Sequence, residues 1–237
     1  MAGLVGFLNI RPEQPWILAV TVIAAAISVE GTVRTHPRWR GDIVDAVMYT
    51  LLPTLAVLGA GLFIDEAIDG YARVGTALAA GAAIGLICYG EYHTVALGTP
   101  MFGTMRLVLA VTTYLTAFAL FTVFFSRNLE LLYATAAVGG IGFALALELL
   151  RESRRRGPSS LLAALAIGIS MAELRVALYY FPLDDLLAGA LLIVGFYLAT
   201  GIVHHLLDED LDTATLAEYL VVAAVSAGVV VIARISV

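Results

Sequence analysis

Long apolar runs separated by short polar segments make up almost the whole chain. These runs predict membrane-spanning helices, because about 20 consecutive apolar residues cross a hydrocarbon core that is about 30 Å thick. We therefore predict an all-α, polytopic membrane bundle that forms a single transmembrane domain over residues 1–237. The runs lie at approximately 16–29, 43–64, 74–97, 107–125, 129–150, 159–181, 186–207 and 216–233.

The first run decides whether the chain has eight spans or seven. Residues 16–29 would form a helix of about 21 Å, which is short of the hydrocarbon thickness. A full crossing gives eight spans, and a re-entrant segment gives seven. A signal peptide is a rival interpretation, with Arg11 before the run and a cleavage-like Ala-Ala-Ala at 24–26. We expect a short, uncleaved first span, preceded by an interfacial segment at 1–10.

Composition supports the membrane interpretation and excludes some chemistry. The chain is 61% hydrophobic and 14% charged, whereas soluble domains are about 45–50% apolar and about 25% charged. All 13 basic residues are arginine, so a Schiff base to lysine, including one with retinal, cannot form. No basic patch carries interleaved aromatic residues, so we expect no nucleic-acid partner. The single cysteine, Cys88, lies inside an apolar run and is expected to pack there.

The placement of arginine predicts the orientation of the chain. Loops after odd-numbered spans carry eight arginines, and the opposite face carries four. Because basic residues favour the cytoplasmic side, we predict a plasma or inner membrane protein with both termini extracytoplasmic. The eight are Arg34, Arg38, Arg40, Arg106, Arg151, Arg154, Arg155 and Arg156, and the four are Arg11, Arg73, Arg127 and Arg234.

Two short similarities raise the possibility of an internal repeat. The first and fifth spans both run into an arginine-rich loop with a proline, and the third and seventh both end in Gly-x-x-His, at Gly90–His93 and Gly201–His204. A parallel repeat of four plus four spans would explain both similarities.

The predicted topology brings several polar residues to one cytoplasmic layer. His204 and Asp208 are four residues apart and share a helix face, and a histidine from another helix would complete a three-ligand zinc site. Such a zinc could activate water to hydrolyse an ester or amide at the membrane surface. The layer contains Asp45, Glu91, His93, Glu148, His204, His205, Asp208 and Glu218. Within it, the candidate metal ligands are His93, His204, His205 and Asp208, and the candidate general bases are Glu91 and Glu218.

A structural interpretation of this layer is the alternative. Histidines, tyrosines and acids are common at the membrane–water interface. Asp212 or Thr213 is a suitable N-cap for the last helix, and Glu148 lies three residues before Arg151, which is typical of pairing on a helix surface. On this interpretation, the layer has no chemistry.

Glu173 and Arg175 are charged residues inside the sixth span. Charged groups at that depth cost about 2.5–3.5 kcal/mol on insertion scales and usually face a bundle interior or a cavity. We predict that Arg175 reaches outward towards Asp184, Asp185 or Glu130, and that Glu173 is either an intramembrane acid on a transport path or part of a buried pair.

The positions of His93, His204 and His205 resemble one feature of the ceramidase and progestin-receptor-like hydrolases, which are seven-helix proteins with a histidine-bound zinc. The final helix of that family carries two histidines four residues apart, whereas here the partner of His204 is Asp208. The resemblance implies a membrane hydrolase with zinc, and it transfers no residue role.

Two classes of function follow from the sequence. The first is a non-catalytic membrane subunit, a scaffold or a small carrier, in contact with the lipid bilayer and with other membrane subunits or copies of itself. The alternative is a membrane-embedded, metal-dependent hydrolase acting on lipid or a lipid-linked substrate. Small-residue faces at Gly81/Gly85, Gly139–Gly142 and Gly189/Gly195/Gly201 would pack helices or partners closely in the first class.

Overall fold

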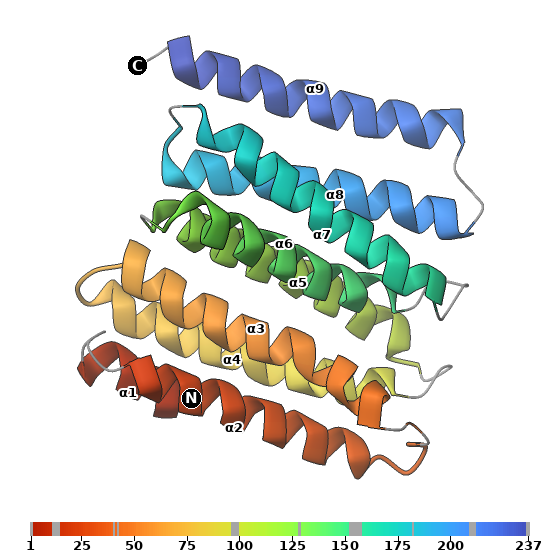
Figure 1. The fold of residues 1–237 in the computed structure, drawn as a ribbon. Coiled ribbons are helices and arrows are strands. Elements are labelled where there is room, and N and C mark those ends of the chain that lie inside the picture. Colours follow the sequence, from red (N-terminus) through yellow and green to blue (C-terminus); the bar gives the residue numbers. More distant parts are fainter. Residues whose placement is uncertain are drawn as a thin grey trace. The chain divides into compact units, whose positions relative to one another are not determined.

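The computed structural model describes residues 2–10, 15–39, 41, 43–95, 100–127, 129–151, 158–181, 183–208 and 212–235. In these ranges every regular element is a helix (Figure 1), which confirms the predicted all-α bundle. The helices are α1 (Ala2–Ile10), α2 (Pro15–Arg34), α3 (Ile43–Ala67), α4 (Ala72–Thr94), α5 (Phe102–Ser126), α6 (Leu131–Leu150), α7 (Pro158–Tyr179), α8 (Asp185–Asp208) and α9 (Thr213–Ile235).

Within the described residues, seven helices, α2 to α8, are long and apolar enough to cross a membrane. The first span is longer than the predicted 16–29, because its polar last turn stays helical. There Arg34 pairs with Glu30 at 2.6 Å, and the Thr32 hydroxyl donates to the Ser28 carbonyl. With 20 residues, or about 30 Å, α2 has the length of a full span. Helix α9 has 23 residues, of which Thr215–Ser226 counts as a shorter apolar helix.

The chain divides into two compact units, Met1–Leu120 and Phe121–Val237. The first contains α1 to α4 and most of α5, and the second contains the end of α5 and α6 to α9. The boundary falls inside the fourth predicted span, close to where a four-plus-four repeat would divide the chain. The repeat itself stays a prediction.

In the first unit, α1 contributes side chains to the hydrophobic core. Its side chains Leu4, Phe7 and Leu8 are buried in an apolar cluster with residues from α2, α3 and α4. The remaining buried members of the cluster are Leu18, Val57, Ile64 and Ala77. A short helix that was expected at the interface therefore packs into the core of its unit.

The first unit also joins α3 to α4 by an ion pair. Arg73, at the start of α4, binds the Asp65 carboxylate near the end of α3 and donates to the Asp65 carbonyl at 3.0 Å. Gly70, in the turn between them, has a φ of +67°, a left-handed conformation that glycine adopts at little cost.

In the second unit, glycines bring α6 and α7 into close contact. A Cβ built on Gly168 would lie 2.8 Å from both the Gly139 carbonyl oxygen and the Phe143 Cβ, and one on Gly142 would lie 3.0 Å from the Met171 Cγ. The predicted face at Gly139–Gly142 is therefore a helix contact, as expected for small residues in membrane bundles.

The other glycine faces differ. Gly189, Gly195 and Gly201 of α8 each lie against another side chain of the second unit, so that prediction is also confirmed. Gly85 of α4 has open space where its Cβ would be, so no described helix is in close contact at that end of Gly81/Gly85, and packing against a partner there stays a prediction.

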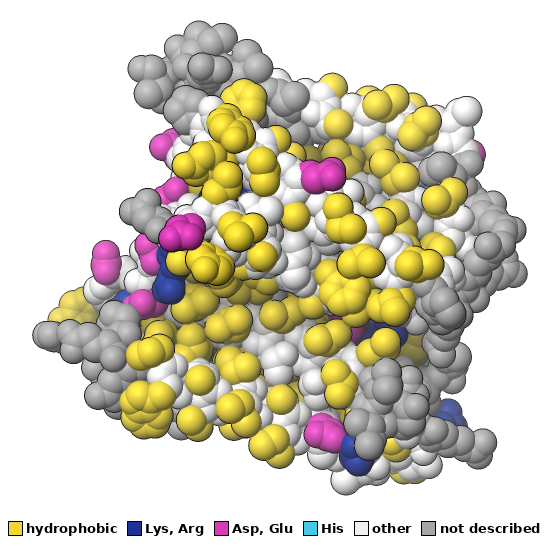
Figure 2. Space-filling view, in the orientation of Figure 1, with side chains coloured by type: hydrophobic (Ala, Val, Ile, Leu, Met, Phe, Trp, Pro, Cys, Tyr) yellow, Lys and Arg dark blue, Asp and Glu magenta, His cyan; other side chains and the backbone are white. Residues whose placement is uncertain are grey.

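Apolar side chains cover much of the molecular face shown in Figure 2. Large exposed residues recur along the spans, and in α7 they include Leu161, Leu162, Leu165 and Ile169, which are 47–65% exposed. Exposed apolar surface of this extent is unsuited to water and suited to lipid. The chain is therefore an integral membrane protein.

Candidate functional site

A histidine–tyrosine cluster lies at the C-terminal end of α4 in the first unit, the end that the placement of arginine predicts to be cytoplasmic. The ring of His93 lies 4.3 Å from that of Tyr89 and 5.5 Å from that of Tyr92, measured between centroids. On its other side Tyr92 contacts His36, at 4.7 Å, and the His36 Nδ1 accepts a hydrogen bond from the backbone N–H of Arg38 at 3.1 Å. Sequence reasoning missed His36, although its place after the first span assigns it to the same membrane face as His93.

Glu91, a candidate general base, is fully buried in this part of α4. The neighbouring Gly90 allows α5 to approach, because a Cβ on it would lie 3.2 Å from Leu109. A base must reach its substrate within hydrogen-bond distance, and a fully buried carboxylate does so only after the helices move. Its catalytic role stays a prediction.

In the second unit, the last turn of α8 holds the remaining two histidines. The His204 Nδ1 lies 3.1 Å from the Asp208 carboxylate, which confirms that these residues share a helix face. His205 faces Tyr219 of α9 with a ring separation of 6.1 Å, and Tyr219 in turn contacts Tyr197 at 5.9 Å. The two tyrosines were not among the predicted residues, because aromatic positions in apolar runs carry no sequence signal for a site.

The start of α9 follows the structural interpretation. The Asp212 carboxylate accepts a hydrogen bond from the Thr215 backbone N–H at 2.8 Å, so Asp212 caps the helix as predicted. Glu218, the second candidate base, is exposed on α9.

The predicted metal ligands belong to different units. His93 lies in the first unit, and His204, His205 and Asp208 lie in the second. Across the described residues, no three histidine, cysteine or acidic side chains are grouped so that they could hold a metal ion. The side chain of Asp45 lies outside the described residues. The assignment of a zinc site stays a prediction.

Glu148 corrects one detail of the structural interpretation. It pairs with Arg151 at 3.1 Å, but its side chain is 1% exposed and that of Arg151 is 13% exposed. The pair is therefore buried, and it is not a helix-surface interaction.

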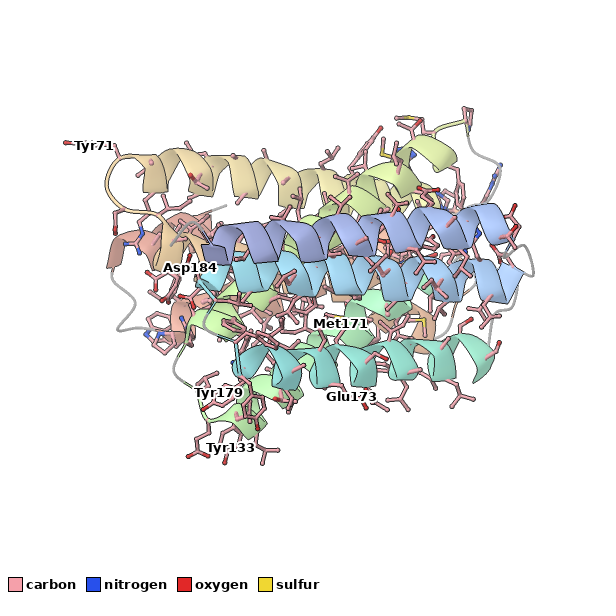
Figure 3. The ribbon with its side chains drawn as sticks, turned by 90° about the horizontal axis from the view of Figure 1, so that it is seen from above. Tyr71, Tyr133, Met171, Glu173, Tyr179 and Asp184 are labelled. Atoms are coloured by element: carbon pink, nitrogen blue, oxygen red, sulfur yellow. The ribbon has the colours of Figure 1, made fainter. Side chains whose placement is uncertain are left out.

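Glu173 is exposed on the outer side of α7. Figure 3 shows it pointing away from the other helices of the second unit, on the opposite side of α7 from Met171, which is 1% exposed. The inward stripe of α7 is Gly168, Met171 and Arg175, and Glu173 lies off this spacing. The expectation that Glu173 faces a bundle interior is therefore wrong for its own unit.

Arg175 is buried, with 4% of its surface exposed. Its guanidinium lies 4.3 Å from the centre of the Phe125 ring and 5.9 Å from that of Tyr179. Its Nε and Nη1 have no hydrogen-bond partner, and no described carboxylate pairs with it. The predicted reach towards Asp184, Asp185 or Glu130 is therefore wrong, because α7 turns the side chain inward under Phe125.

These helices and their apolar surface define a polytopic membrane protein. The chain matches the model of the DUF5656 family, proteins of unknown function, over residues 2–233, and it belongs to that family. The comparisons with curated proteins and with solved structures each found no match.

Proposed function

We propose that this protein is a non-catalytic membrane subunit, and that the outer face of α7 binds a transmembrane helix of a partner protein. The observation that supports this function is the exposure of Glu173 on an otherwise apolar helix face. Glu173 lies six residues before the end of α7, or about 9 Å into the span.

The physical reason is the cost of a carboxyl group that faces lipid at this depth. Acidic residues inside membrane spans cost about 2.5–3.5 kcal/mol on insertion scales, and Glu173 has no ion-pair or hydrogen-bond partner within the described residues. A partner helix with an arginine, lysine or amide side chain at the same depth would relieve that cost. The neighbouring Leu165 and Ile169, which are 47% and 53% exposed, would supply apolar contact.

A second copy of the chain is a poorer partner for this face. In a symmetric membrane dimer the two copies present the same residues at the same depth. The arginine nearest to that depth in α7 is Arg175, which is buried. A second copy would therefore bring another carboxyl group to Glu173 instead of a cation.

The outward position of Glu173 also favours a subunit over a small carrier, because the residue does not line the interior of its own unit. The hydrolase remains the second candidate, supported by the His204–Asp208 pair, which is one ligand short of a three-ligand zinc site. We assign the protein to the plasma or inner membrane with both termini extracytoplasmic, on the eight arginines against four.

Site-directed photocrosslinking in native membranes tests the proposed function. A photoreactive residue at Ile169 should give one discrete protein adduct, and Glu173→Leu should abolish it while Glu173→Gln retains part of it. An adduct of twice the chain mass would identify a second copy, against the partner proposed.

The matched control is a photoreactive residue at Leu132 of α6, which is 73% exposed on the same unit. We expect it to react with lipid alone. If Ile169 also reacts with lipid alone, and Glu173→Leu changes nothing, the subunit proposal is wrong.

A further inference from the structure

Arg175 is a buried cation without a counter-ion in the described part of the chain. It is 4% exposed, and two of its nitrogen atoms, Nε and Nη1, donate to no described group. Instead of a carboxylate, the faces of the Phe125 and Tyr179 rings contact its guanidinium. All three residues belong to the second unit, so this arrangement depends on one unit alone.

The aromatic contacts do not balance the burial of this charge. Removing an ion from water costs far more than one or two cation–π contacts return, and unsatisfied N–H groups add to the cost. Thr122, one turn before Phe125 on α5, also has a buried Oγ1 without a hydrogen-bond partner, on a side chain that lies against Gly189 of α8. An anion with several oxygen acceptors would satisfy such donors.

Access to Arg175 lies along its own helix face. Met171, Arg175 and Tyr179 follow one another at spacings of four residues, and their exposure rises from 1% to 4% to 54%. Arg175 lies about 6 Å from the end of α7. The Tyr179 side chain is therefore the group between the guanidinium and the membrane surface.

The surroundings indicate which anion reaches this place. Tyr180 and Phe181 follow Tyr179 and are 73% and 51% exposed, and Tyr133 lies at the same end of the unit (Figure 3). Exposed aromatic side chains of this kind sit at the level of lipid headgroups, where phosphate groups are concentrated. A guanidinium binds phosphate through two parallel N–H donors.

We propose that Arg175 anchors a binding site for the phosphate of an anionic phospholipid, with Tyr179 as its cover and Phe125 as its floor. This site is on the buried side of α7, and it does not depend on the partner face that carries Glu173.

Thermal unfolding of the purified full chain in neutral detergent tests the site. The probes are phosphatidylglycerol, phosphatidylcholine and sodium phosphate, and the variants are Arg175→Met and the control Arg34→Met, whose arginine is exposed in the first unit. Phosphatidylglycerol at about tenfold its Kd should raise the Tm of wild type and of Arg34→Met by about 3–6 °C. Arg175→Met should show no shift.

The other outcomes are also decisive. An equal shift in Arg175→Met, or no shift with any probe, overturns the site. A shift with sodium phosphate and none with phosphatidylglycerol retains the anion site but overturns lipid as its source. If Arg175→Met does not fold, Arg175→Lys replaces it, and a shift clearly smaller than that of wild type is expected, because lysine lacks the forked donors. Glu173→Leu should keep the full shift, which separates this site from the partner face.

Discussion

The two units hold their helices together by different means. The first unit uses an ion pair between Asp65 and Arg73 at a helix–helix turn, together with a short apolar helix packed into its core. The second unit uses close backbone approach at Gly168, and the two charged residues inside α7 pair with no described group. Charges at the ends of spans thus serve the fold in the first unit, whereas the charges within α7 of the second unit form no ion pair with the described residues.

The largest effect is expected where the second unit is most tightly packed. Gly168→Ala places a Cβ at 2.8 Å from the Gly139 carbonyl oxygen, so α6 and α7 must separate, and we expect a loss of about 3 kcal/mol in the free energy of unfolding. Unfolding in mixed micelles with a rising denaturant fraction measures it. The control is Gly140→Ala, where nothing lies within 4 Å, and which should be neutral or slightly stabilising. Equal losses in both variants would contradict the glycine contact.

Breaking the ion pair of the first unit should have a smaller effect. Asp65→Asn removes the charge that faces Arg73, whose side chain is 25% exposed, and the remaining hydrogen bond to the Asp65 carbonyl limits the loss to about 2 kcal/mol. The same unfolding measurement applies. The matched control, Glu30→Gln, breaks the exposed pair with Arg34 and should cost at most about 0.5 kcal/mol. If Asp65→Asn lowers the free energy of unfolding no more than Glu30→Gln does, the Asp65–Arg73 pair does not hold α3 to α4.

Removing the His204–Asp208 pair should change stability little. The His204 side chain is 48% exposed, so His204→Ala should cost about 0.5 kcal/mol. The proposed subunit function predicts no stoichiometric zinc, in wild type or in this variant, when the protein is purified without chelators and measured by elemental mass spectrometry. About one zinc per chain, lost in His204→Ala, would replace the subunit proposal with the hydrolase.

The smallest effect is expected for Glu173→Leu on the isolated protein. Glu173 faces away from its unit in the folded chain, so its removal should change the free energy of unfolding by less than about 0.5 kcal/mol. The same substitution should abolish the photocrosslinked adduct. A large loss of stability with the adduct retained would show that Glu173 acts within the fold.

The sequence was sufficient for the fold class and for local relations along one helix. The lengths of the apolar runs predicted eight spans, and the described residues show seven of them, α2 to α8, as helices long and apolar enough to cross a membrane. Residue spacing predicted the His204–Asp208 pair and a cap at Asp212 or Thr213, because both depend on contacts within a few residues. The orientations of Glu173 and Arg175 could not be predicted. In α7 both faces are apolar, so hydrophobic periodicity does not show which side packs against α6. That side is chosen by Gly168, whose importance depends on where Gly139 lies in another helix.

The burial of α1 has a consequence for the order of events during synthesis. The cluster that receives Phe7 includes Ala77, which lies 70 residues later in the chain (77 − 7). At about 5–20 residues per second, the ribosome reaches Ala77 roughly 4–14 s after it has added Phe7. During this interval the apolar cluster that buries α1 is incomplete, so the apolar side chains of α1 remain at the bilayer surface or in the insertion machinery. Helix α1 therefore reaches its final position only after this part of α4 has been made.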